Sequence, residues 1–135
     1  LKQANFKIYK AKKMNRKNIL IIDDDNSTRL LLDVLLRTRY ETNTQKTAID
    51  ALLWLSYGNI PDLILLDMCM PHFDGTSFLK NIRTSGFYKH IPVLMLSANE
   101  AQNEIDEALE WGVDGFVRKP FKPIELQQKI QHLLA

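Results

Sequence analysis

The chain has 135 residues, of which 45% are hydrophobic and 25% charged, and this is room for one compact domain with an ordinary buried core. No apolar run approaches the roughly 18 residues that span a bilayer, so we expect no membrane association. The single cysteine, Cys69, excludes an internal disulfide and a cysteine-based zinc site, and it favours a reducing, cytoplasmic setting.

The positive charge is concentrated at the start of the chain. The formal net charge is +2, yet seven of the 18 basic residues lie in residues 1–17, which hold no acid. The remaining residues 18–135 contain 11 basic and 16 acidic residues. Because a nucleic-acid-binding patch lies on a folded face, we expect no direct nucleic-acid binding by this domain. We interpret residues 1–16 as a basic N-terminal extension or an expression remnant, and residues 17–135 as the folded domain.

From residue 18 onward, short apolar runs alternate with stretches of helical period. The runs predict strands at residues 19–22, 40–45, 63–66, 93–96 and 115–117, of which the second is weak because it is polar. Apolar spacings of three and four predict one helix after each strand. The residues that mark these helices are Leu30, Leu31, Val34, Leu35, Ala48, Leu52, Leu55, Phe78, Leu79, Ile82, Ile105, Ala108, Leu109, Leu126, Ile130 and Leu133. Asn26 or Ser27 is predicted to cap the first helix, and Asp74-Gly75 to begin the third.

This alternation of five strands and five helices is typical of the α/β class. It predicts a doubly wound, five-stranded parallel sheet with helices on both faces. The nearly continuous apolar character of the first, third and fourth strands indicates that they lie centrally in the sheet. Functional groups of such folds collect at the carboxyl ends of the strands, and that edge is where we look for the site.

The strand ends carry residues suited to phosphate chemistry, namely Asp23 and Asp24, then Asp67, Ser97 and Lys119. If the first and third strands are neighbours, the carboxylates converge and suit a hard divalent cation, for which Mg²⁺ is the first candidate. A carboxylate can also act as a nucleophile and form an aspartyl phosphate. A metal ion and a lysine would then surround the phosphoryl oxygens, with a serine hydroxyl as a further donor.

Four segments carry a resemblance to a known family, namely residues 21–25, 66–75, 96–98 and 118–121. Together they resemble the receiver domain of bacterial two-component response regulators, over about residues 17–135. The spacings of 43, 30 and 22 residues between Asp24, Asp67, Ser97 and Lys119 agree with that family, and four motifs in order are a specific signal. The resemblance implies a flavodoxin-like sheet with strand order 2-1-3-4-5.

The resemblance also implies roles for individual residues. Asp67 would accept a phosphoryl group from a sensor histidine kinase or a phosphotransfer protein. Asp24 and Asp67 would ligate Mg²⁺ directly, with the backbone carbonyl of Cys69 as a third protein ligand. Asp23 would act through a metal-bound water, and Lys119 would pair with Asp67 and then with the phosphoryl group. The domain would not be an enzyme beyond slow self-dephosphorylation.

A switch is implied as well. Ser97 would move toward the phosphate and Phe116 would turn inward, which changes the face of the fourth helix, fifth strand and fifth helix that a downstream effector reads. A cis bond is expected before Pro120. Phe116 lacks the hydroxyl of the tyrosine often found at this place. Cys69 and Asn99 occupy positions that border the phosphate in the family.

Two alternatives to a phosphorylated receiver remain open. A haloacid-dehalogenase-type phosphatase also uses a strand-end aspartate, and residues 23–27 approximate its signature, but only Glu125 follows Lys119 as a late acid. Phosphate on Asp23 in place of Asp67 would identify it. An unphosphorylated pseudo-receiver would fail to bind Mg²⁺.

For the remaining polar residues, simple structural roles suffice. Asp25 is expected in a solvated turn before the first helix. Cys69 is expected to be inert, because no basic group accompanies it locally. The histidines are expected at the surface or in loops, because they lack ligand spacing.

Overall fold

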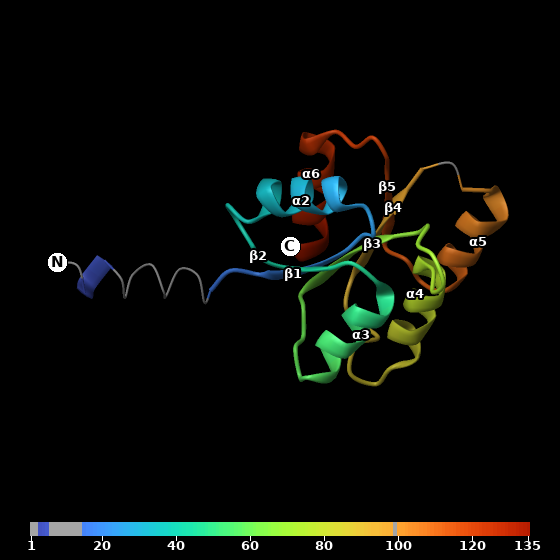
Figure 1. Ribbon diagram of the computed structural model, residues 1–135, viewed down its shortest axis with the longest axis horizontal. Helices are drawn as coiled ribbons and strands as arrows, with labels where there is room; N and C mark the ends of the chain where they lie inside the picture. Colours follow the sequence, from blue (N-terminus) through green and yellow to red (C-terminus); the bar gives the residue numbers. More distant parts are fainter. Residues whose placement is uncertain (1–2, 6–14, 99) are drawn as a thin grey trace.

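The computed structural model describes residues 3–5, 15–98 and 100–135, and it shows a parallel sheet with helices on both faces (Figure 1). The strands are β1 (Asn18–Ile22), β2 (Glu41–Gln45), β3 (Leu63–Asp67), β4 (Val93–Ser97) and β5 (Gly115–Arg118). The helices are α2 (Asn26–Leu36), α3 (Ala48–Ser56), α4 (Gly75–Thr84), α5 (Gln102–Glu110) and α6 (Pro123–Leu134). Each lies within a few residues of its predicted position.

The strand order is β2-β1-β3-β4-β5, with every neighbouring pair parallel, so the predicted flavodoxin-like topology is confirmed. The chain runs outward from β1 to the edge strand β2 and then crosses back to β3. The order therefore reverses between β1 and β3, where Ile22 is in register with Leu66. The acids that follow these two strands consequently lie at the crevice where doubly wound sheets bind their ligands.

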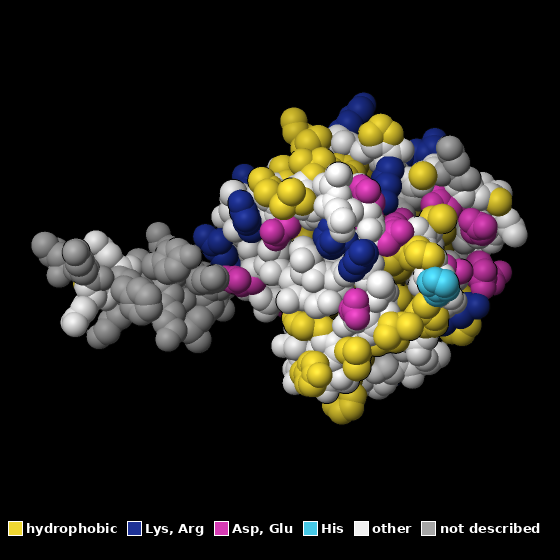
Figure 2. Space-filling model, in the orientation of Figure 1, with side chains coloured by type: hydrophobic (Ala, Val, Ile, Leu, Met, Phe, Trp, Pro, Cys, Tyr) yellow, Lys and Arg dark blue, Asp and Glu magenta, His cyan; other side chains and the backbone are white. Residues whose placement is uncertain are grey.

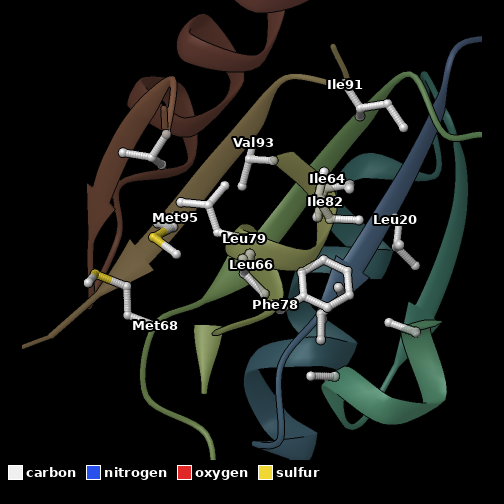
Figure 3. Packing of buried hydrophobic residues seen from close by; sticks show 14 of the residues in the cluster. Leu20, Ile64, Leu66, Met68, Phe78, Leu79, Ile82, Ile91, Val93 and Met95 are labelled. Carbon is white, nitrogen blue, oxygen red and sulfur yellow. The ribbon is translucent and has the colours of Figure 1, made fainter. Parts of the chain in front are cut away.

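Alternate strand residues divide between two cores, because successive side chains of a strand point to opposite faces. One core joins the sheet to α3, α4 and α5, and the other joins it to α2 and α6. In the first core, α4 contributes Phe78, Leu79 and Ile82, which lie over the side chains of β3 and β4 in Figure 3. All five residues of β3 are buried, which explains its continuous apolar run.

The start of α2 differs from the prediction. The residue that caps α2 is Asp25, whose carboxylate accepts a hydrogen bond from the backbone N–H of Thr28 at 2.9 Å. Asn26 is already helical, and its side chain accepts from Arg29. The extended backbone at Asp25, with ψ of 117°, brings the carboxylate over the first free amide groups of the helix. The predicted caps at Asn26 and Ser27 are therefore wrong.

The other predicted helix start, at Asp74-Gly75, is confirmed. Asp74 caps α4 by accepting from the N–H of Ser77 at 2.8 Å. Gly75 has a second role, because a Cβ built there would lie 2.3 Å from the carbonyl oxygen of Asp67. Only glycine lets α4 begin this close to the end of β3, and this contact places the helix against the site.

At the start of the domain, Lys17 already belongs to the fold, because its carbonyl accepts from the N–H of Glu41 at 2.9 Å. The Arg16 guanidinium reaches the carbonyl of Arg37 at 3.1 Å. Where the folded domain begins stays a prediction. Among the residues described, none of the helices has the length and apolar character that crossing a membrane requires.

Candidate functional site

Three carboxylates meet at the carboxyl ends of β1 and β3. Asp23, Asp24 and Asp67 each offer an oxygen, and these oxygens lie within 4.8 Å of one another. Asp23 is fully buried, Asp67 is 5% exposed and Asp24 is partly buried. Like charges this close destabilise one another unless a cation lies between them. The donor set of hard carboxylate oxygens, without nitrogen or sulfur, fits Mg²⁺.

The carboxylate of Asp23 is held on both oxygens by this chain. Its Oδ1 accepts from the N–H of Asp25 at 2.9 Å, and its Oδ2 accepts from the Lys119 ammonium at 2.8 Å. Its own N–H donates to the carbonyl of Gln45 at 3.2 Å, and its carbonyl accepts from Arg29 at 2.7 Å. Asp23 is thus oriented by its backbone as well as its side chain.

Lys119 lies between two of the acids. Its Nζ is 2.8 Å from Asp23 Oδ2 and 3.3 Å from Asp67 Oδ1. Its N–H donates to the carbonyl of Ser97 at 2.7 Å, and the following bond to Pro120 is cis, as expected. Desolvation lowers the pKa of Lys119, but the hydrogen bond that Lys119 donates to Asp23 and the charges of Asp67 and Asp23 outweigh it, so the pKa is raised overall. The ammonium therefore stays charged.

The environment of Asp67 disfavours its ionised form. Burial, followed by the charge of Asp23, raises the pKa of Asp67 to about 7. The Lys119 charge and the N–H of Cys69, which donates to Asp67 Oδ1 at 3.2 Å, act in the opposite direction. The single Lys119 charge therefore does not neutralise all three carboxylates. An added cation would supply the missing positive charge and is expected to bind here.

The remaining candidates surround this cluster. Ser97 is buried and ends β4, one residue beyond the Leu96 that pairs with Asp67. Phe116 is partly buried and packs against the core beneath α3, α4 and α5. Cys69 is exposed overall. Partial desolvation of its thiol, followed by the negative charges of nearby acids, Asp67 first, raises the pKa of the thiol. The thiol therefore stays protonated and unreactive. Asn99 lies outside the described residues.

Two features of the site escape sequence reasoning. One is the bond from Lys119 to Asp23, which is shorter than the expected bond to Asp67. The other is Arg29, whose position one turn after the acids is a signal that could have drawn attention to it. Strand-end position singles out residues that reach the site, but it leaves their pairing open.

Comparison with known proteins shows similarity to response regulators and chemotaxis proteins. The model of the response regulator receiver domain family matches residues 19–131. The chemotaxis protein CheY-3 of Vibrio cholerae is 38% identical over 117 residues, which cover 85% of this chain and 89% of that protein. The chemotaxis protein CheY of Pseudomonas aeruginosa is also 38% identical over 117 residues, covering 85% of this chain and 94% of its own.

Solved structures show the same likeness. The Vibrio cholerae chemotaxis protein CheY4 superposes with a TM-score of 0.82 at 30% identity, covering 88% of this chain and 99% of its own. The signal receiver domain of a signal transduction histidine kinase from Syntrophus aciditrophicus gives a TM-score of 0.80 at 30% identity, with 87% and 89% covered. The fold and its acidic strand ends define the class of CheY-like receiver domains. This chain belongs to the response regulator receiver domain family.

Proposed function

We propose that this receiver domain accepts a phosphoryl group on Asp67 from a histidine-phosphorylated kinase or phosphotransfer protein. The observation that carries the proposal is the meeting of three carboxylates within 4.8 Å beside Lys119. Asp24, Asp67 and the backbone carbonyl of Cys69 would hold Mg²⁺, with Asp23 acting through a bound water. The relatives support a signalling role, since they include chemotaxis proteins and a two-component response regulator.

The transfer is a substitution at phosphorus. A carboxylate oxygen of Asp67 forms a bond to phosphorus while the phosphorus–nitrogen bond of the donor imidazole breaks. The electron pair of that bond stays on the imidazole nitrogen, which takes up a proton. Mg²⁺ would supply positive charge to the phosphoryl oxygens. Lys119 turns from Asp67 to the new phosphoryl oxygens, because they carry more charge than the carboxylate did.

The charge of the phosphoryl group also explains how the surface read by an effector would change. In the proposed switch, the Ser97 hydroxyl moves to donate to a phosphoryl oxygen, and Phe116 fills the space that this movement leaves. Both residues lie on β4 and β5, next to the surface of α5, β5 and α6, which is the face predicted for a downstream effector. Phosphorylation would thereby shift this surface from its resting conformation toward a second conformation that an effector recognises.

The bonding of Asp23 bears on the phosphatase alternative. In that alternative Asp23 would be the nucleophile, but it is fully buried, and both of its carboxylate oxygens accept hydrogen bonds from this chain. At Asp67, by contrast, the contacts from Cys69 and Lys119 both reach one carboxylate oxygen, Oδ1. These contacts favour Asp67 as the nucleophile.

Labelling with acetyl phosphate in Mg²⁺ tests the proposal. Intact-mass measurement is expected to show one phosphoryl group on the unaltered protein and none on Asp67→Asn. The matched control is Asp74→Asn, which keeps a helix cap outside the acid cluster and should be labelled normally. Phosphate mapped to Asp23 would establish the phosphatase alternative. Absence of both labelling and Mg²⁺ binding would identify a pseudo-receiver.

A further inference from the structure

The first turn of α2 carries a guanidinium that binds the backbone of the acid loop. Arg29 Nη1 donates to the carbonyl oxygen of Asp23 at 2.7 Å, and Arg29 Nη2 donates to the side-chain oxygen of Asn26 at 2.5 Å. Both acceptors are uncharged oxygens. We propose that Arg29 is a positioning residue, which orients the peptide between Asp23 and Asp24 and thereby the carboxylates that bind the metal.

The geometry of the peptide explains how the bond acts. The carbonyl of Asp23 and the N–H of Asp24 belong to one planar unit, so fixing the carbonyl oxygen fixes the direction in which the chain enters Asp24. On the other side, the N–H of Asp23 is held by Gln45 and its carboxylate by Asp25 and Lys119. Arg29 is the contact that acts on the peptide leading to Asp24.

Arginine suits this place because of its shape. Its planar fork presents several donors in fixed directions. Here two of them reach the backbone oxygen of Asp23 and the side-chain oxygen of Asn26, three positions further along the chain. A lysine at the same place would keep the charge but lose the fork. Replacement by lysine therefore separates charge from geometry.

The charge and the geometry of Arg29 affect cation binding in opposite directions. A positive charge near the acids repels Mg²⁺, so its removal alone would tighten binding. Loss of orientation would weaken binding, as removal of groups that orient metal ligands does. When Arg29 is replaced by an uncharged residue, weaker Mg²⁺ binding therefore indicates a positioning role, and tighter binding indicates a purely electrostatic one.

The inference rests on the proposed function, because it takes the acid cluster as the metal site. The test is calorimetric titration of the unphosphorylated full chain with Mg²⁺. Arg29→Met is expected to weaken binding about tenfold. Arg29→Lys loses the fork but keeps the charge that repels Mg²⁺, so it is expected to weaken binding at least as much. The matched control is Arg37→Met, at the C-terminal end of the same helix, where the arginine pairs with Asp33 at 3.9 Å. This control should bind Mg²⁺ as the unaltered protein does.

A second readout needs no metal. Hydrogen exchange at the N–H of Asp25, which donates to Asp23, should become faster in Arg29→Lys at an unchanged melting temperature. Equal or tighter Mg²⁺ binding by Arg29→Met, or unchanged exchange in Arg29→Lys, would overturn the positioning role. If the unaltered protein binds no Mg²⁺, the proposed metal site fails, while the exchange measurement still decides whether Arg29 holds the loop.

Discussion

At the scale of single residues, the acids differ in what the fold does to their charge. Asp67 lies beside Asp23 at a buried strand end, and burial together with that neighbour raises its pKa from an ordinary 3.8 to about 7. Asp25 is exposed, and its hydrogen bonds to Thr28 lower its pKa. The two aspartates therefore have opposite pKa shifts, because Asp25 accepts hydrogen bonds from Thr28 at a helix start and Asp67 lies beside a like charge at a buried strand end.

The raised pKa of Asp67 predicts a pH dependence of the metal-free protein. Between about pH 4 and about pH 7 the folded state keeps a proton that the unfolded state has released, so the free energy of unfolding falls as pH rises through this range. Asp67→Asn removes this fall. Urea unfolding in a chelator should show the variant increasingly more stable than the unaltered protein toward about pH 8. A stability difference independent of pH would contradict the burial of a charged Asp67.

His72 has an unfavourable backbone conformation. It follows Pro71 in the loop after β3 and has a φ of 70°, in the left-handed region that costs a residue with a Cβ about 1–2 kcal/mol. His72→Gly removes this strain but adds about 0.5–1 kcal/mol of chain entropy. The variant should therefore gain about 0.5–1 kcal/mol in the free energy of unfolding, measured by urea denaturation.

Gly58 provides the reverse control. It has a φ of 93°, and a Cβ built there meets no atom within 4 Å. Gly58→Ala should therefore lose stability through the backbone alone, by about 1 kcal/mol. If His72→Gly instead lowers the free energy of unfolding, the imidazole makes a stabilising contact that outweighs the backbone strain.

At the scale of elements, Arg83 joins the end of α4 to the loops at the amino ends of β4 and β5. Its guanidinium donates to the carbonyls of Lys89, Ile91 and Gly112 and to the carboxylate of Asp114 at 2.9 Å. Asp114 in turn accepts from the first N–H of β4 at 2.8 Å. One side chain thus donates to three backbone carbonyls and one carboxylate from two different loops.

Arg83→Met should lower the free energy of unfolding by about 2–3 kcal/mol, because carbonyl oxygens and a carboxylate lose their donor together. Chemical denaturation measures the loss. Arg37→Met is the matched control, and the exposed ion pair that it removes should change stability by less than about 0.5 kcal/mol. Equal losses in the two variants would show that Arg83 contributes only as a surface charge.

At the scale of the whole molecule, charge is unevenly distributed along the chain but mixed over the folded domain. Acidic and basic side chains are interspersed on the face drawn in Figure 2, and no uniformly basic patch is visible there. The acid cluster is a local imbalance of charge, because Asp23, Asp24 and Asp67 lie together and Lys119 pairs with two of them, Asp23 and Asp67. A divalent cation at this one place is therefore expected to change the stability of the entire domain.

Mg²⁺ at about 100 times its dissociation constant should raise the free energy of unfolding by about 2.7 kcal/mol, because it binds only the folded state. The gain in melting temperature should shrink below about pH 6, where protons compete for Asp67. Asp24→Ala should abolish it and, by relieving the crowding of acids, should leave the metal-free protein at least as stable. An undiminished gain in this variant would place the metal away from the cluster.

The sequence alone determined the arrangement of elements and the candidate residues. Apolar runs and helical spacings are local properties of the chain, so they located the five strands and the helices α2 to α6. Even the polar β2 was recognised between two helices. The four motifs that contain Asp24, Asp67, Ser97 and Lys119 were sufficient to recognise the family, because they occur in the order and at the spacings of that family. Asp74-Gly75 likewise predicted the start of α4 from local geometry alone.

Only the tertiary structure decided how these residues pair. Lys119 reaches Asp23 across 96 positions, and Arg83 reaches Asp114 across 31, distances over which local patterns carry no information about hydrogen-bond partners. Among three consecutive aspartates, the backbone at the end of β1 buried Asp23 and turned Asp25 outward as the helix cap. Burial and pairing depend on which strands become neighbours, and for that reason charge and pKa at this site follow from the folded sheet and not from the spacing of the acids.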